Sequence, residues 1–227
     1  MAGGSGFPDH DAGQIGRDRT YVKVDGALTY NAWCEGLRDG RSYISDGMSH
    51  LMEFSINNVP LGQNHSEVPL DQPGLVHVAV KATAWLDASP RPVPDQERRS
   101  PSDWRLEWAR IGSTREVPFE LLVNGAPAFH TNLVADGRLY SLAFEVEVPH
   151  SSWIAARILP SSHTNPMWVQ IAGQPLRPDR RSAAWCLQVV EQSWARLQPT
   201  LQPEEAAAAK RAYDHARQVY ARLQSEN

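Results

Sequence analysis

The chain is poor in cysteine and does not begin like a secreted protein. Only Cys34 and Cys186 occur among its 227 residues, far apart in the sequence. There is no Cys-x-x-Cys pair and no disulfide framework, which favours a reducing compartment. The first residues, MAGGSGFPDHD, lack both a basic region and an apolar region, so no signal peptide is predicted. The cytoplasm is therefore the default expectation for location.

Long apolar runs and an excess of basic charge are also absent. No segment reaches membrane-spanning length, so no membrane partner is expected. The formal net charge is −4, and the short basic clusters at 98–99 and 177–181 lie among acids and prolines. These clusters predict solvated loops, so no nucleic-acid partner is expected.

Several catalytic motifs are missing as well. The sequence contains no His-x-His, no His-Glu-x-x-His, no P-loop and no Gly-x-Gly-x-x-Gly. The Gly-x-Ser-x-Gly motif of a nucleophilic serine does not occur either. A self-contained metallohydrolase needs several converging ligands, and few credible ones occur here.

The composition is suited to a sizeable core, with 41% hydrophobic and 21% charged residues. The segments 20–24, 41–45 and 50–58 read as strands. Between the first two, residues 28–40 predict an amphipathic helix with Trp33 and Leu37 on one face. Thr29 is expected to cap its start, and Gly40 to close it.

From Gly74 to about residue 173 the pattern is that of closely spaced strands with turns between them. Strands are predicted at 74–86, 104–111, 117–123, 139–148, 152–159 and 167–172. Asn124-Gly125 is a hairpin-turn signal because both residues tolerate positive φ. The proline-rich segment 87–103 predicts a long loop. This spacing favours a β-sandwich.

The last fifty residues have a helical pattern. Ser182 is a candidate N-cap for a helix whose apolar residues are Trp185, Val189, Trp194 and Leu197. A second helix is predicted to begin near Pro203, with its apolar face lined by Tyr213, Ala216, Tyr220 and Leu223. The two helices are expected to form a hairpin. Most of the eight tryptophans are expected to pack in cores, and any exposed ones would offer platforms for sugars.

Three groups of polar residues are candidates for a site. Asp9, His10 and Asp11 supply ligand types that divalent metals prefer, although a solvated loop is the simpler interpretation. Arg41, Asp46 and His50 flank a turn, where they either bind an anionic substrate and transfer protons or merely form the turn. In PSSHTNP (160–166), Ser162, His163 and Asn165 either line a site or hydrogen-bond their own backbone. The catalytic candidates are His50 and His163, and the substrate-binding candidates are Arg41, Asp46, Ser162 and Asn165.

Several stretches, read in order, resemble one family. They are GRDRTYVKVDGALTYNAWCEGLRDGRSYISDGMSHLMEF, ELLVNG, ADG, SSWIAARILPSSHTNPMWVQIAGQPLR and RRSAAWCLQVVEQSW. They resemble the C-terminal part of metal-dependent hydrolases of the polymerase-and-histidinol-phosphatase (PHP) superfamily, in its carbaryl-hydrolase-like branch. The resemblance covers nearly the whole chain.

The resemblance implies a barrel-like metal-binding domain followed by a β-sandwich. Leu37 to Gly47 would then be the end of the catalytic domain. The family's His-x-His motif has no counterpart here, and Gly6 stands where the family tends to carry an aspartate before Phe7-Pro8. If a metal is held, zinc or manganese is implied.

These observations predict a mainly β protein in three parts. Residues 1–48 would be the remnant of a PHP-type catalytic domain, 49–176 an immunoglobulin-like sandwich and 177–227 a helical hairpin. The predicted function is that of a non-catalytic accessory portion of a PHP-type hydrolase. Two alternatives stay open: a hydrolase whose site is completed by a partner chain, and a carbohydrate-binding module. The expected partner is an N-terminal PHP-type domain or a second subunit, and an apolar patch around Trp33, Leu37, Tyr43 and Ile44 would also favour self-association.

Overall fold

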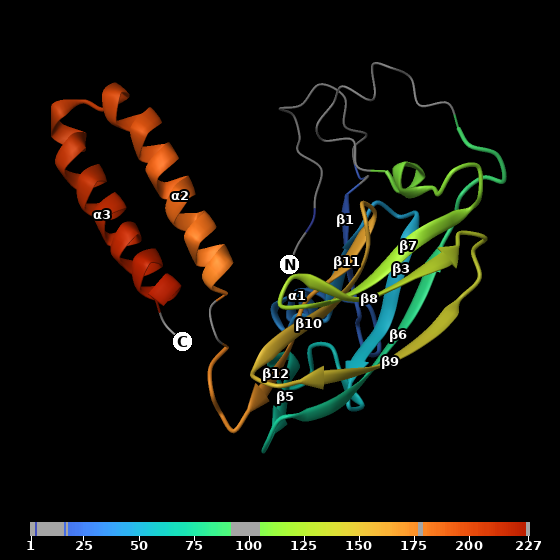
Figure 1. Ribbon diagram of the computed structural model, residues 1–227. Coiled ribbons are helices and arrows are strands. Elements are labelled where there is room, and N and C mark those ends of the chain that lie inside the picture. The colour runs from blue at the N-terminus through green and yellow to red at the C-terminus, as the bar shows by residue number, and fades with distance from the viewer. Residues whose placement is uncertain (1–2, 4–15, 17, 92–104, 177–178, 226–227) are drawn as a thin grey trace. The chain divides into compact units, whose positions relative to one another are not determined.

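A computed structural model describes residues 3, 16, 18–91, 105–176 and 179–225. The chain divides into two compact units, residues 1–175 and 176–227. The first unit is mainly β and holds two sheets, and the second consists of a pair of helices (Figure 1). A mainly β chain with a C-terminal helical pair was predicted, and this is confirmed. The three-part division at residues 48 and 176 stays a prediction.

The larger sheet of the first unit has eight strands. Its central strand β10 (Ser152–Ile158) pairs with β7 on one side and with both β11 and β12 on the other. The remaining strands extend the sheet outward, with β8 beyond β7, β2 and then β1 beyond β11, and β5 beyond β12. All pairs are antiparallel except β5 with β12. The bounds are β1 Arg19–Val22, β2 Ser42–Ser45, β5 Glu67–Leu70, β7 Glu116–Val123, β8 Ala126–Val134, β11 Ser162–Thr164 and β12 Met167–Ile171.

The smaller sheet has four strands in the order β4-β3-β6-β9. Their bounds are β3 Ser49–Ile56, β4 Val59–Pro60, β6 Gly74–Ala84 and β9 Tyr140–Val148. The alternation predicted for the long strands is confirmed, because Val76, Val78 and Val80 are buried while their neighbours along β6 are more exposed. A bulge interrupts the pairing of β3 with β6 between Met52 and Ser55.

One apolar core joins the two sheets. It takes Leu51, Phe54 and Ile56 from β3, the valines of β6, and the inward residues of β7, β10 and β12. Phe119 of β7 stacks on Phe144 of β9, with ring centroids 5.7 Å apart. The sheets therefore bury a shared face, which is the arrangement that stabilises a two-layer β domain.

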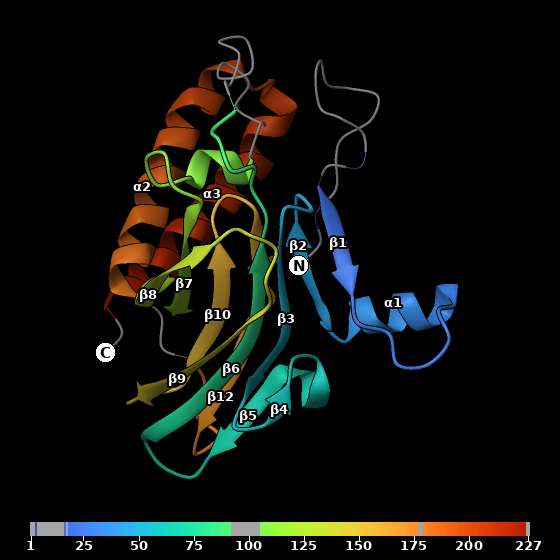
Figure 2. The same ribbon diagram turned by 90° about the vertical axis from the view of Figure 1, so that its right-hand side faces the viewer.

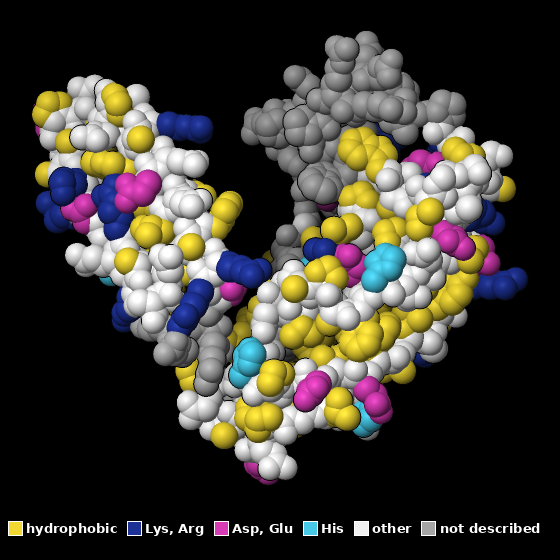
Figure 3. Space-filling view, viewed as in Figure 1, with side chains coloured by type: hydrophobic (Ala, Val, Ile, Leu, Met, Phe, Trp, Pro, Cys, Tyr) yellow, Lys and Arg dark blue, Asp and Glu magenta, His cyan; other side chains and the backbone are white. Residues whose placement is uncertain are grey.

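The side of this unit formed by β8 and β9 is open. Neither strand pairs with the other, and apolar side chains gather along both (Figure 3). Phe129 is 37% exposed and contacts Phe144, with ring centroids 5.3 Å apart. The sequence pattern did not predict β8, although the Asn124-Gly125 turn that precedes it has the expected positive φ at both residues.

The N-terminal segment stands on the edge of the larger sheet. Helix α1 (Tyr30–Arg38) follows β1 and leads back into β2, and both β1 and α1 project from the two-sheet body (Figure 2). Thr29 caps α1 by accepting a hydrogen bond from the Ala32 amide at 3.1 Å, and Gly40 has φ of 78° after the last turn. Both were predicted. Gly36 allows α1 to approach β1, because a Cβ there would lie 2.5 Å from Cγ1 of Val22.

One predicted strand is wrong. Residues 106–109 form a 3-10 turn, η3 (Leu106–Ala109), and Trp104 lies outside the described residues. Apolar alternation placed Leu106 and Trp108 on one face, but Leu106 is buried while Trp108 is 44% exposed. Local bonds explain the turn: Arg110 binds both carboxylate oxygens of Glu107, at 2.6 and 2.9 Å. Of the predicted loop 87–103, residues 92–103 also lie outside the described part.

The second unit is a helical hairpin, as predicted. Helix α2 (Arg180–Leu197) leads through η4 (Gln198–Thr200) into α3 (Pro203–Ser225), and Trp194 packs on Tyr213 with centroids 4.9 Å apart. The N-cap of α2 is Asp179 and not Ser182, since the Asp179 carboxylate accepts from the amides of residues 181 and 182. Trp185 is 64% exposed. It does not share the packed face of Trp194, because nine residues correspond to half a turn of rotation. None of the helices in the described ranges combines the length and apolarity needed to span a bilayer.

Candidate functional site

Two polar segments that the sequence marked as candidates meet in space. They are the turn between β2 and β3 and the segment that forms β11. Asp46 is the main link. Its Oδ1 accepts from the Ser161 hydroxyl and from the Met48 amide at 2.8 Å, and its Oδ2 accepts from the Leu106 amide at 3.1 Å. The carboxylate thus holds three separate segments together.

Serine hydroxyls continue this link into the interior. Oγ of Ser49 lies 2.7 Å from Oγ of Ser161 and 2.6 Å from Oγ of Ser162. The Ser45 hydroxyl donates to the Ser49 carbonyl at 2.5 Å and accepts from the Gly47 amide at 2.8 Å. All four serines are at most 5% exposed. We call Ser45, Asp46, Ser49, Ser161 and Ser162 the hydroxyl joint.

Asn165, which directly follows β11, forms a second link to the N-terminal segment. Its Nδ2 donates to the Gly40 carbonyl at 3.0 Å and to Oγ of Ser42 at 2.9 Å. Asn165 is 6% exposed, and its Oδ1 is buried without a partner among the described atoms. The side chain therefore fixes the end of α1 against β11 and does not face open solvent.

His50 belongs to a cluster of aromatic rings on β1, β2 and β3. Its Nδ1 lies 2.8 Å from the Tyr43 hydroxyl, and its ring meets Tyr21 edge-on at 4.9 Å. Burial lowers the pKa of His50, and the nearby Asp46 carboxylate only partly opposes this effect. Burial also raises the pKa of the Tyr43 phenol. The hydrogen bond therefore joins a protonated phenol to a neutral imidazole.

His163 lies on the other face of the sheet. Cross-strand neighbours share a face, and β11 pairs His163 with Ile44 but Thr164 with Tyr43. The Nδ1 of His163 is 2.6 Å from the Thr164 carbonyl oxygen, and burial lowers the pKa of this histidine. The two predicted catalytic histidines are thus not brought together. Proton transfer by either one stays a prediction.

Arg41 is engaged by carboxylates of its own segment. Its guanidinium pairs with Asp25 at 3.0 Å and with Asp39 at 3.3 Å, while its backbone carbonyl accepts from the Lys23 amide at 2.8 Å. The stem of Arg41 is close to the turn after β4, because a Cβ on Gly62 would lie 2.0 Å from Cγ of Arg41. The predicted anion-binding role of Arg41 has no geometric support in these contacts.

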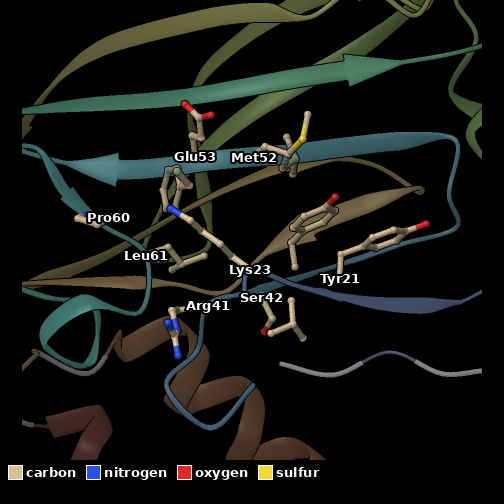
Figure 4. Close-up of a pocket in the computed structure, with 12 residues that line it drawn as sticks. Tyr21, Lys23, Arg41, Ser42, Met52, Glu53, Pro60 and Leu61 are labelled. Carbon is tan, nitrogen blue, oxygen red and sulfur yellow. The ribbon is translucent and has the colours of Figure 1, made fainter. Parts of the chain in front are cut away.

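A cavity of about 360 Å³ opens beside the aromatic cluster, between β1–β2 and β3–β4 (Figure 4). Tyr21 and Tyr43 both line it, and their rings stack on each other with centroids 5.1 Å apart and nearly parallel planes. The lining residues are Tyr21, Val22, Lys23, Arg41, Ser42, Tyr43, Leu51, Met52, Glu53, Phe54, Pro60 and Leu61. Its volume falls within the range of small-molecule sites.

The predicted metal ligands Asp9, His10 and Asp11 lie outside the described residues. Within the described ranges, no three His, Cys, Asp or Glu side chains are grouped closely enough to hold a metal ion. The geometry therefore offers a buried polar joint and a mostly apolar cavity as the features with functional potential.

Comparison with known proteins identifies no relative. No family model, no curated protein and no solved structure matches the chain.

Sequence reasoning found part of this region and missed the rest. Asp46, Ser162 and Asn165 were candidates, and they do lie in the contact between the two polar segments. Ser49 and the cavity residues Tyr21 and Lys23 were missed. Alternation along the predicted strand 20–24 could have shown that Tyr21 and Lys23 share one face, but the observed strand β1 ends at Val22 and is too short to reveal which face is covered.

Proposed function

We propose that this chain is the accessory, non-catalytic C-terminal portion of a PHP-type metal-dependent hydrolase. In this proposal β1, α1 and β2 are the end of the catalytic domain, and the remaining strands of the two sheets are an immunoglobulin-like accessory domain. The proposal rests on the sequence resemblance together with one structural observation at the N-terminal segment.

That observation is an uncovered apolar surface on the α1 segment. Leu28 is 79% exposed and Tyr30 is 82% exposed, and Gly36 is the only buried residue of α1. Within the described strands, β1 pairs with β2 alone. Short helices gain most of their stability from burying an apolar face. A further body that covers Leu28 and Tyr30 would supply this burial, and the resemblance identifies it as the catalytic domain.

The hydroxyl joint supports the same proposal from the other side. It attaches β2 to β3 and β11 through buried polar contacts, so the α1 segment is held firmly by the two-sheet body. A catalytic domain resting on α1 would therefore be positioned by the sheets. This is how an accessory domain without chemistry of its own can shape an active site.

Association with a catalytic domain tests the proposal. A PHP-type domain of the carbaryl-hydrolase-like branch, produced without its own C-terminal portion, would be titrated with this chain by calorimetry. We expect binding that Leu28→Asp weakens by at least tenfold, since a charge would enter an apolar contact. Leu75→Asp is the matched control, because Leu75 is 59% exposed but lies on β6. No binding, or equal binding by both variants, would refute the proposal.

The isolated chain supplies a second test. Its zinc and manganese content would be measured by mass spectrometry, and its hydrolysis of phosphate and carbamate esters assayed with each metal. The accessory function predicts neither stoichiometric metal nor turnover. Metal-dependent hydrolysis lost in His10→Ala or His50→Ala would establish an enzyme instead.

Exposed tryptophans favour carbohydrate binding as the second candidate. Trp85 and Trp108 are each 44% exposed and Trp185 is 64% exposed, whereas most tryptophans were expected in cores. Aromatic faces in solvent can stack on sugar rings. Fluorescence titration with a panel of glycans would show quenching that Trp108→Ala removes. An unchanged spectrum across the panel would eliminate this candidate.

A further inference from the structure

We propose that the cavity between β1–β2 and β3–β4 binds a small organic carboxylate with an aromatic body. This inference goes beyond the accessory function and does not depend on it, because every residue that carries it belongs to the first unit of this chain.

The walls favour an aromatic body. Leu51 and Phe54 form an apolar floor and are each 2% exposed. The stacked rings of Tyr21 and Tyr43 also line the cavity. An aromatic ligand would remove this apolar area from water and could stack on the tyrosines, and both effects are favourable.

The charges favour an anion. Lys23 extends from the end of β1 across the cavity toward β3 (Figure 4). Among the described residues, no carboxylate lies within ion-pair distance of its ammonium group. The other two charged side chains of the lining are already paired, Arg41 with Asp25 and Asp39, and Glu53 with Lys81 at 2.7 Å. Lys23 is therefore the cation available to a ligand.

The backbone around the cavity is shaped by an irregular strand. Glu53 has φ of 51° at the bulge of β3, a left-handed conformation that is costly for a residue with a Cβ. The Glu53 carboxylate points away from the cavity (Figure 4), where it meets Lys81. The bulge thus directs the Glu53 carboxylate toward Lys81 and not toward Lys23.

Calorimetry with a matched pair of probes tests the proposal. Biphenyl-4-carboxylate and biphenyl-4-carboxamide have nearly the same shape but differ by one charge. We expect the carboxylate to bind about tenfold more tightly, a difference of about 1.4 kcal/mol. Equal affinities would overturn the assignment of an anion, and no binding of either probe at millimolar concentration would overturn the site.

Variants and NMR locate the binding. Lys23→Met should weaken the carboxylate about tenfold and leave the carboxamide unchanged, because Lys23 is exposed and its loss should not affect folding. Lys210→Met, on α3 in the second unit, is the charge-matched control. Amide shifts on titration should centre on residues 21–23, 41–43 and 51–54. Shifts centred elsewhere, or equal weakening in both variants, would overturn the proposal.

Discussion

Replacing Asp46 with alanine should destabilise the first unit strongly. The change removes three hydrogen bonds, from Ser161, Met48 and Leu106. Hydrogen bonds to charged groups contribute about 1.5 kcal/mol or more each, so the loss of three should cost about 4–5 kcal/mol. Leu106 is fully buried, and its amide would be left without an acceptor. Asp46→Asn keeps one amide oxygen and should lose about half as much.

The measurement is urea unfolding followed by the folded-state amide peaks of β3 and β10, which report on the first unit alone. The midpoint should fall while the slope stays constant, since the surface exposed on unfolding hardly changes. Asp71→Ala is the control, because Asp71 is exposed at the turn between β5 and β6. A loss below about 1 kcal/mol for Asp46→Ala would refute the view that this carboxylate holds the three segments together.

Two further predictions concern backbone geometry and pH. Gly62→Ala should lower the free energy of unfolding by about 2–4 kcal/mol in thermal unfolding, because φ is 85° and the new Cβ would lie 2.0 Å from Cγ of Arg41. Gly74→Ala is the control and should change the stability little, because a Cβ there would have nothing within 4 Å. Equal effects of the two changes would contradict this reasoning. Burial lowers the folded-state pKa of His50, so the stability that its neutral form confers is complete above the ordinary pKa of 6.5 and is lost as the pH falls through the lowered pKa. His50→Phe should make the stability less dependent on pH below about 6.5, with His163 supplying the remaining dependence. An unchanged pH profile of the unfolding midpoint would contradict this prediction for His50.

The elements that the sequence predicted well are those whose local and tertiary preferences agree. β6 and β9 alternate over nine or more residues, and their pairing buries the faces that the alternation marked. The start and end of α1 follow from Thr29 and Gly40, whose capping properties depend on neighbouring residues alone.

The errors arise where a short pattern suits two structures. Leu106 and Trp108 alternate as in a strand, yet the ion pair of Arg110 with Glu107 and the bond to Asp46 stabilise a tight turn. Ser182 has the residue type of an N-cap, but the helix begins one turn earlier, where the Asp179 carboxylate accepts from the amides of residues 181 and 182. These outcomes depend on contacts that hydrophobic periodicity does not encode.

The candidate site shows the same division. Polar residues in turns were correctly recognised as unusual, and Asp46 and Ser162 do meet across the fold. Their burial was not foreseen, because a run such as PSSHTNP has the composition of an exposed loop. Its central residues became β11 only because β2 and β10 flank it. The cavity was missed because its walls come from four strands that no local pattern relates.

The hydroxyl joint also restricts the register in which β2 and β11 can pair. If β11 slipped by one residue along β2, Ser162 would face away from Ser49, and His163 would enter the interior in its place. Each hydroxyl buried without a partner costs about 1–3 kcal/mol. The hydroxyl joint therefore discriminates between neighbouring registers, and the N-terminal segment can assemble on the sheets in one alignment only.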